Sequence, residues 1–263
     1  LANALNVNGS LTLGGSNALT LAGTVAGTGS LIKNGIANLT LSGNNTYAGP
    51  TALNAGGLIL ASNTALGSGA LNAAAGTTFD SSTAVALANT VNLAGNLGIL
   101  GTADLSLNGL VSGTGGLTKT GAGNLTLNGA NAYLGGTQLN AGSLTLGNAS
   151  ALGSGALAVN GATTLDTNTA LALANNTSLN AALTVGGSND LSLNGVVDGS
   201  GSLTKAGGAN LTLNGANTYS GGTALNAGTL TLGSTTALGS GALTVGGAAT
   251  LANSTPLVLA NAV

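Results

Sequence analysis

An 86-residue period runs through this chain without a gap and constrains its fold more than any other feature. Asn38-Leu39-Thr40-Leu41 recurs at 124–127 and again at 210–213. The same step relates the three lysines, the three tyrosines and the heptapeptides that begin at Ala65, Ala151 and Ala237. A long period kept without insertions is typical of proteins in which each unit stacks on the next in register. It predicts a single continuous solenoid over 1–263, with units at about 26–111, 112–197 and 198–263, the last incomplete and continued in phase by 1–25.

Within each unit the apolar residues alternate with a period of two. Leu39-Thr40-Leu41 and Leu105-Ser106-Leu107 are examples, and each predicts a short strand with Leu inward and Thr or Ser outward. Asn-Gly, Gly-Gly and Gly-Ser-Gly separate these segments and mark turns. Antiparallel hairpin arrays also contain short strands, but the gapless repeat favours stacked coils.

The expected fold is therefore all-β, a right-handed parallel β-helix of about 12 coils and three 86-residue repeats. Four coils of roughly 21.5 residues would make one unit, which would rise ~19 Å along the axis.

The composition excludes most enzyme chemistries. Three Lys and five Asp are the only charged side chains, and the chain has neither His nor Cys. Imidazole or thiolate metal sites and Ser-His-Asp or Cys-His nucleophiles are therefore impossible. Three lysines cannot form the basic patch that nucleic acid requires. With no apolar run of about 20 residues there is also no candidate membrane span. We predict no enzyme, no cofactor, and no catalytic, cofactor-binding or metal-binding residues.

The lysines and tyrosines are expected to have structural roles. The lysines are predicted to lie in solvent at strand edges or turns, where they discourage lateral pairing: Lys33, Lys119 and Lys205. The tyrosines are predicted to pack against coil corners and to hydrogen-bond through their hydroxyls: Tyr47, Tyr133 and Tyr219.

The acidic and outward threonine residues leave two alternatives open. The acidic residues are expected to form turns, although a pair such as Asp190 and Asp198 could serve a glycan-cleaving β-helix: Asp80, Asp104, Asp166, Asp190 and Asp198. The outward threonines are expected to be ordinary strand surface, although a flat array could bind ice or glycan: Thr40, Thr126 and Thr212.

Three segments, at about 33–58, 119–144 and 205–230, carry one motif. The second copy reads Lys119-Thr120-Gly121-Ala122-Gly123-Asn124-Leu125-Thr126-Leu127, followed by Asn131-Ala132-Tyr133 and Gly135-Gly136-Thr137. This pattern resembles the passenger-associated transport repeat of bacterial autotransporters. The first copy departs from it at Gly35-Ile36, and at Pro50, where the others have Gly136 and Gly222.

The resemblance implies an exported passenger at the surface of a Gram-negative bacterium, a structural or adhesive β-helix stalk or fibre. Both ends of the chain fall in the same phase of the unit without a polar cap, and the surface has little charge. We therefore expect its partners to be copies of itself or flanking repeats of the same chain, stacked end to end into filaments. Host or matrix glycans are further candidate partners.

Overall fold

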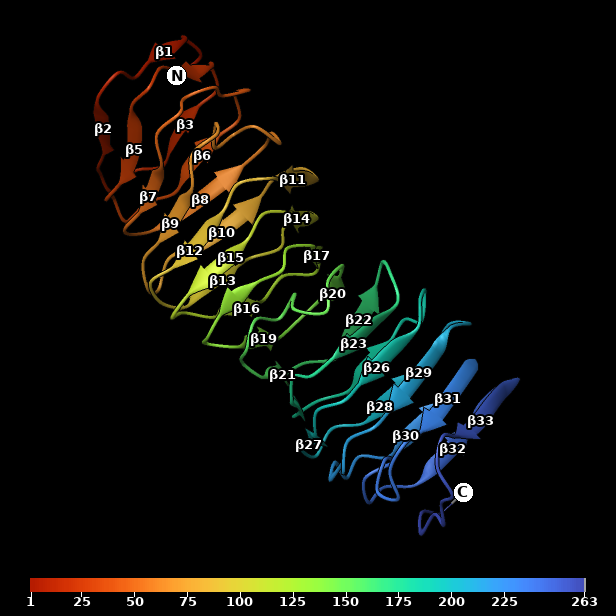
Figure 1. The fold of residues 1–263 in the computed structure, drawn as a ribbon. Helices are drawn as coiled ribbons and strands as arrows, with labels where there is room; N and C mark the ends of the chain where they lie inside the picture. The colour runs from red at the N-terminus through yellow and green to blue at the C-terminus, as the bar shows by residue number, and fades with distance from the viewer. Residues whose placement is uncertain (263) are drawn as a thin grey trace.

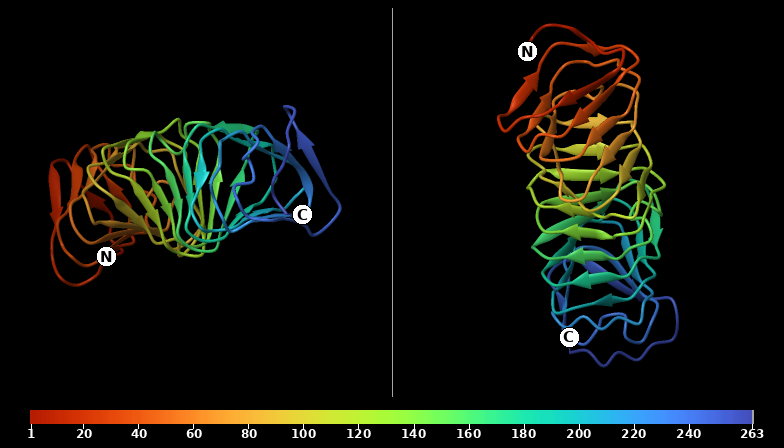
Figure 2. Two further views of the ribbon diagram at one scale, coloured as in Figure 1. Left: turned by 90° about the horizontal axis from the view of Figure 1, so that it is seen from below. Right: turned by 90° about the vertical axis from the view of Figure 1, so that its left-hand side faces the viewer.

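The computed structural model describes residues 1–262 as a rod of short strands, with the two termini at opposite ends (Figure 1). All strand pairings are parallel, and no helix occurs in these residues. The views in Figure 2 show successive coils winding about one axis. The predicted parallel β-solenoid of about 12 coils is confirmed.

Each coil contributes strands to three faces. The first face holds β1(Leu5–Asn6), β4(Val25–Ala26), β11(Val85–Leu87), β14(Leu105–Leu107), β17(Asn124–Leu127), β20(Ser143–Leu146), β22(Thr163–Thr167), β25(Leu183–Val185), β28(Leu203–Lys205), β30(Thr223–Leu225) and β32(Leu243–Val245). The second face holds β2(Ser10–Leu13), β5(Ser30–Lys33), β7(Thr51–Leu53), β9(Leu71–Ala73), β12(Val91–Leu93), β15(Val111–Gly113), β18(Ala132–Tyr133), β23(Leu171–Leu173), β26(Leu191–Leu193), β29(Asn210–Leu213), β31(Gly228–Leu232) and β33(Ala249–Asn253). The third face holds β3(Leu19–Leu21), β6(Leu39–Leu41), β8(Gly57–Leu60), β10(Thr78–Ser81), β13(Leu97–Ile99), β16(Leu117–Lys119), β19(Thr137–Leu139), β21(Leu157–Val159), β24(Thr177–Leu179) and β27(Val197–Asp198).

One irregular segment per unit interrupts a face. Residues 62–69 form turns between β4 and β11 on the first face, and residues 148–155 do so between β18 and β23 on the second. Residues 234–241 repeat this beyond β27 on the third face. The backbone continues to bond across the gap, since the amides of Ser68 and Ser154 donate to the carbonyls of Tyr47 and Tyr133.

The coil is shorter than expected. Stacked partners are usually 20 residues apart, as in Leu105 with Leu125. The step from Leu125 to its partner Leu144 is 19 residues, and the step from Leu144 to Leu165 is 21 residues, so the two deviations cancel. The predicted 21.5-residue coil is wrong, because three strands of about three residues and their tight glycine turns fit into 20.

The shorter coil changes how the units are arranged around the rod. An 86-residue unit fills four coils of 20 residues and leaves six over, about one third of a coil. Each unit therefore begins one face later than the unit before it. The lysines follow this advance, because they lie in β5, β16 and β28 on the second, third and first faces. The expectation that equivalent residues lie four coils apart is wrong for this reason.

Ladders of inward aliphatic residues fill the interior. Leu105, Leu125 and Leu144 stack on the first face, and each is at most 1% exposed. Burying a Leu side chain contributes roughly 1.5–3 kcal/mol. Only neighbouring coils can cover these side chains, so each coil depends on the coils above and below it.

Candidate functional site

The three lysines of the motif are buried inside the rod. Lys119 and Lys205 are 0% exposed and Lys33 is 4% exposed, so the prediction that they lie in solvent is wrong. The reason is strand parity, since Lys119 lies two residues after inward Leu117 and therefore points the same way. In the ladder Lys119 replaces an aliphatic residue between Ile99 and Leu139.

Each ammonium group is held by turn carbonyls. Lys205 Nζ donates to the carbonyl oxygens of Ala206 at 2.6 Å, Gly207 at 2.8 Å and Ala227 at 3.3 Å, the last from the next coil. Lys33 Nζ donates to Gly35 and, at 3.0 Å, to Ala55. Lys119 Nζ donates to Gly121 and, at 3.4 Å, to Ala141. The lysine therefore joins two successive turns from within.

Burial sets the protonation behaviour of these groups. Desolvation lowers the pKa of each lysine from its usual 10.5. The carboxylates of Asp104 and Asp80 oppose this lowering of the pKa at Lys119, and those of Asp166 and Asp190 oppose it at Lys205. A buried ammonium group that donates to carbonyl oxygens of two successive turns holds those turns together, and we call this arrangement the lysine clip.

The predicted role of the tyrosines is confirmed. All three are 0% exposed, and each hydroxyl lies 2.5–2.6 Å from that of the threonine four residues later, in the pairs Tyr47–Thr51, Tyr133–Thr137 and Tyr219–Thr223. Burial raises the pKa of each tyrosine to about 12. No tyrosine ring is free to stack on a ligand.

An asparagine two residues before each tyrosine links three successive coils. The sequence analysis did not predict this role. The Asn131 side chain accepts a hydrogen bond from the Val111 amide at 2.8 Å and donates one to the Ala151 carbonyl at 2.7 Å. Asn45 and Asn217 make the equivalent bonds. The signal was present in the sequence, because these residues keep the 86-residue step and share strand parity with the buried tyrosine.

The aspartates accept hydrogen bonds from the adjacent residue or from a neighbouring coil. The expectation that all of them form turns is wrong, because Asp80, Asp166 and Asp198 lie in strands β10, β22 and β27. Asp80 accepts hydrogen bonds from the amides of Ser81 and Thr102, both at 2.9 Å. Asp104 and Asp190 each accept one from an amide of the next coil at 2.8 Å. Asp190 precedes β26 and Asp198 ends β27, so the pair considered for glycan cleavage lies on different faces. Residues 1–262 contain no group of three metal-ligating side chains of the His, Cys, Asp or Glu type.

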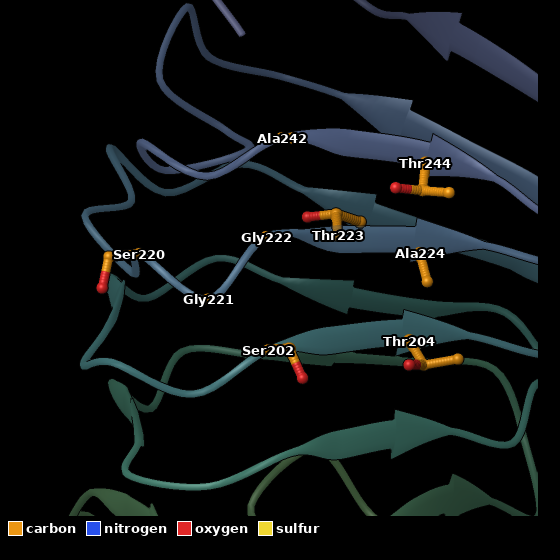
Figure 3. Close-up of a pocket in the computed structure, with 9 residues that line it drawn as sticks. All are labelled: Ser202, Thr204, Ser220, Gly221, Gly222, Thr223, Ala224, Ala242 and Thr244. Atoms are coloured by element: carbon orange, nitrogen blue, oxygen red, sulfur yellow. The ribbon is translucent and has the colours of Figure 1, made fainter. Parts of the chain in front are cut away.

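The outward threonines named from the sequence are distributed around the rod. Thr40, Thr126 and Thr212 lie in β6, β17 and β29, on three different faces. The longest file of outward threonines on the first face is Thr164, Thr184 and Thr204, which Ala224 interrupts before Thr244. At the interruption lies a shallow hollow of about 250 Å³ lined by small hydroxyl residues, alanines and glycines (Figure 3). Thr126 and Thr145 form a second, shorter file that ends at Asp166. Both files are one residue wide and interrupted, unlike a flat array.

Comparison with known proteins places these observations in a family. The family model described as passenger-associated transport repeat matches residues 31–60, 117–146 and 203–232. The chain is 36% identical over 241 residues to "Adhesin BmaC autotransporter" of Brucella suis biovar 1 (strain 1330). That alignment covers 82% of this chain, but only 7% of the length of the adhesin. No solved structure matches the chain.

The matched segments coincide with the parts of each unit that hold the lysine clip, the bridging asparagine and the tyrosine–threonine pair. Within residues 1–262 there is no helix long and apolar enough to cross a membrane. The three repeats and the related adhesin agree with the motif read from the sequence. The chain therefore carries three passenger-associated transport repeats and is similar to a segment of an autotransporter adhesin.

Proposed function

We propose that this chain is a non-enzymatic stalk segment of an adhesive surface passenger, which holds binding surfaces at a distance from the cell that exports it. The observation that supports this is where the motif places its polar groups. Lysine, asparagine, tyrosine and threonine of each repeat bond to one another or to the backbone inside the rod. The repeated residues thus stabilise a length of rod and do not line a reaction site.

Enzymatic activity is the main alternative, and it can be tested directly. The purified chain is incubated with a panel of neutral and acidic polysaccharides, and the release of reducing or unsaturated ends is measured. We expect no turnover. Turnover that Asp190→Asn abolishes would replace this proposal with a glycan-cleaving one.

The stalk is extended by further coils, supplied by flanking repeats of the same polypeptide or by a second copy. Parallel ladders have no intrinsic end, because each coil presents the same unpaired strands to the next. Electron microscopy of the purified chain is expected to reveal rods that associate end to end. Leu5→Lys or Leu259→Lys should keep them short, because a charge would be buried at the contact. Rods that stay single at high concentration would contradict association between copies.

A further inference from the structure

An open groove crosses the first unit where the first face lacks strands between β4 and β11. Two adjoining hollows of about 500 and 450 Å³ share Asn63 and Thr64. Their linings come from three successive coils, at residues 42–44, 61–68 and 84–89. Each volume lies within the range of small-ligand sites, roughly 300–1,000 Å³.

Two side-chain amides in this groove are held by their oxygen atoms. The Ala86 amide donates to Asn63 Oδ1 at 2.8 Å, and because a backbone N–H can only donate, this bond fixes the orientation of the Asn63 amide. Ser62 Oγ accepts a hydrogen bond from the Thr64 amide at 3.2 Å and donates to Asn44 Oδ1 at 2.5 Å. Both NH₂ groups therefore remain as donors, and neither has an acceptor among the described residues.

The chemistry of the groove favours an uncharged ligand rich in hydroxyl groups. No charged residue lines it, and its other walls are serines, alanines, Gly67, Thr64 and Asn89, whose Nδ2 already donates to the carbonyls of Gly67 and Gly69. A bound peptide would need pockets for large anchoring side chains, and these small residues offer none. A sugar ring presents oxygen atoms that accept from the two amides, and carbon–hydrogen faces that can lie on the methyl groups of Ala84, Ala86 and Ala88.

We propose that this groove binds a neutral oligosaccharide through Asn44 and Asn63. The proposal rests on the adhesive role argued above and names the class of partner. The groove chemistry belongs to the first unit alone. The positions of Asn44 and Asn63 are occupied by Ala130 and Ala149 in the second unit. In the third unit they are Ala216 and Thr235.

The repeats therefore provide the test variant. Asn44→Ala with Asn63→Ala gives the first unit the residues that the second unit already carries at the equivalent positions, Ala130 and Ala149, so the fold should be retained. The probes are short neutral gluco-, galacto- and manno-oligosaccharides, with acidic oligosaccharides and unrelated peptides as comparison, and the readout is affinity by titration calorimetry. We expect the parent to bind a neutral probe and the double variant to lose more than about tenfold in affinity. Asn180→Ala, which removes an exposed amide elsewhere on the rod, should bind like the parent.

Two results would overturn the proposal: no neutral probe binds the parent, or the double variant binds it equally well. Binding of only acidic probes or peptides would also overturn it. Circular dichroism and the polysaccharide turnover assay on the same samples separate the two proposals. A folded, inactive rod that binds no sugar leaves the stalk function standing and removes only the site.

Discussion

At the scale of single residues, this chain uses its few polar functional groups as internal connectors. Asn131 joins the amide of Val111 on one coil to the carbonyl of Ala151 two coils further along. Its carboxamide provides the donor and acceptor that the interrupted strand ladder lacks. Exposed ladder asparagines such as Asn180, whose Nδ2 donates to Asn160 at 2.9 Å, have water as an alternative partner.

Asn131→Ala should destabilise the rod far more than Asn180→Ala. The first substitution leaves two buried backbone groups without partners, at about 1–3 kcal/mol each, and the second leaves groups that water can reach. Urea unfolding followed by circular dichroism is the measurement. Equal losses of stability in the two variants would show that the interior bridge has no special role.

The buried lysines and the buried tyrosines should change the free energy of unfolding in opposite directions as the pH becomes alkaline. The lowered pKa of each lysine means that the unfolded chain binds more protons, so the free energy of unfolding rises with pH up to about 10.5. The raised pKa of each tyrosine, about 12 against 10.0, means that the folded chain keeps its proton longer. Between pH 10 and 12 stability should therefore fall, by about 1.4 kcal/mol per pH unit for each tyrosine.

Thermal melts between pH 8 and 12 measure this profile. A variant with Tyr47, Tyr133 and Tyr219 all changed to Phe should lose most of the decline above pH 10. If the parent melts at one temperature throughout this range, the tyrosines and lysines do not control stability in the way argued.

Strand alternation and the long period predicted the stacking, the inward leucines and the family motif, because these depend on local pattern. The burial of Lys33, Lys119 and Lys205 was not predicted, because an ammonium group in a core is costly unless turn carbonyls converge on it. That convergence is a property of the folded turns. The groove at Asn44 and Asn63 was also not predicted, since it depends on which coils lie side by side.

At the scale of elements, the turns determine how closely coils can stack. Gly153 lies in the turn segment 148–155 with φ +60°, and a Cβ there would lie 2.2 Å from the Tyr133 carbonyl oxygen. Gly208 lies in another turn, where a Cβ would meet nothing within 4 Å. Both glycines lie between strands, but of the two only Gly153 is required by the packing.

Gly153→Ala should cost more than about 2 kcal/mol of folding free energy, because both the backbone conformation and the close approach are lost. Gly208→Ala should change stability by less than about 0.5 kcal/mol. Chemical denaturation of the two variants beside the parent gives these values. A neutral Gly153→Ala would mean that the coils can separate locally without penalty.

At the scale of the whole molecule, the length that can be removed without disturbing the strand register is the 86-residue unit. Deleting 112–197 joins residue 111 to residue 198. Because residue 198 is the equivalent of residue 112 in the next unit, each strand ladder should continue. Small-angle scattering should find a folded rod shorter by about 20 Å. Deleting only 112–121, half a coil, should prevent cooperative folding, because inward leucines would then meet turns. A rod that tolerates the half-coil deletion would contradict the register argued from the ladders.

The advance of one face per unit also governs the valency of the molecule. Equivalent groups on neighbouring units point in directions a third of a turn apart, and they point the same way again only after three units, about 60 Å along the axis. A rigid bivalent partner that recognises one repeated epitope must therefore either reach around the rod or span that distance. A flat lattice of receptors for such an epitope would engage one unit in three, whichever side of the rod it meets, so avidity for the lattice would increase with the number of unit triplets in a longer rod.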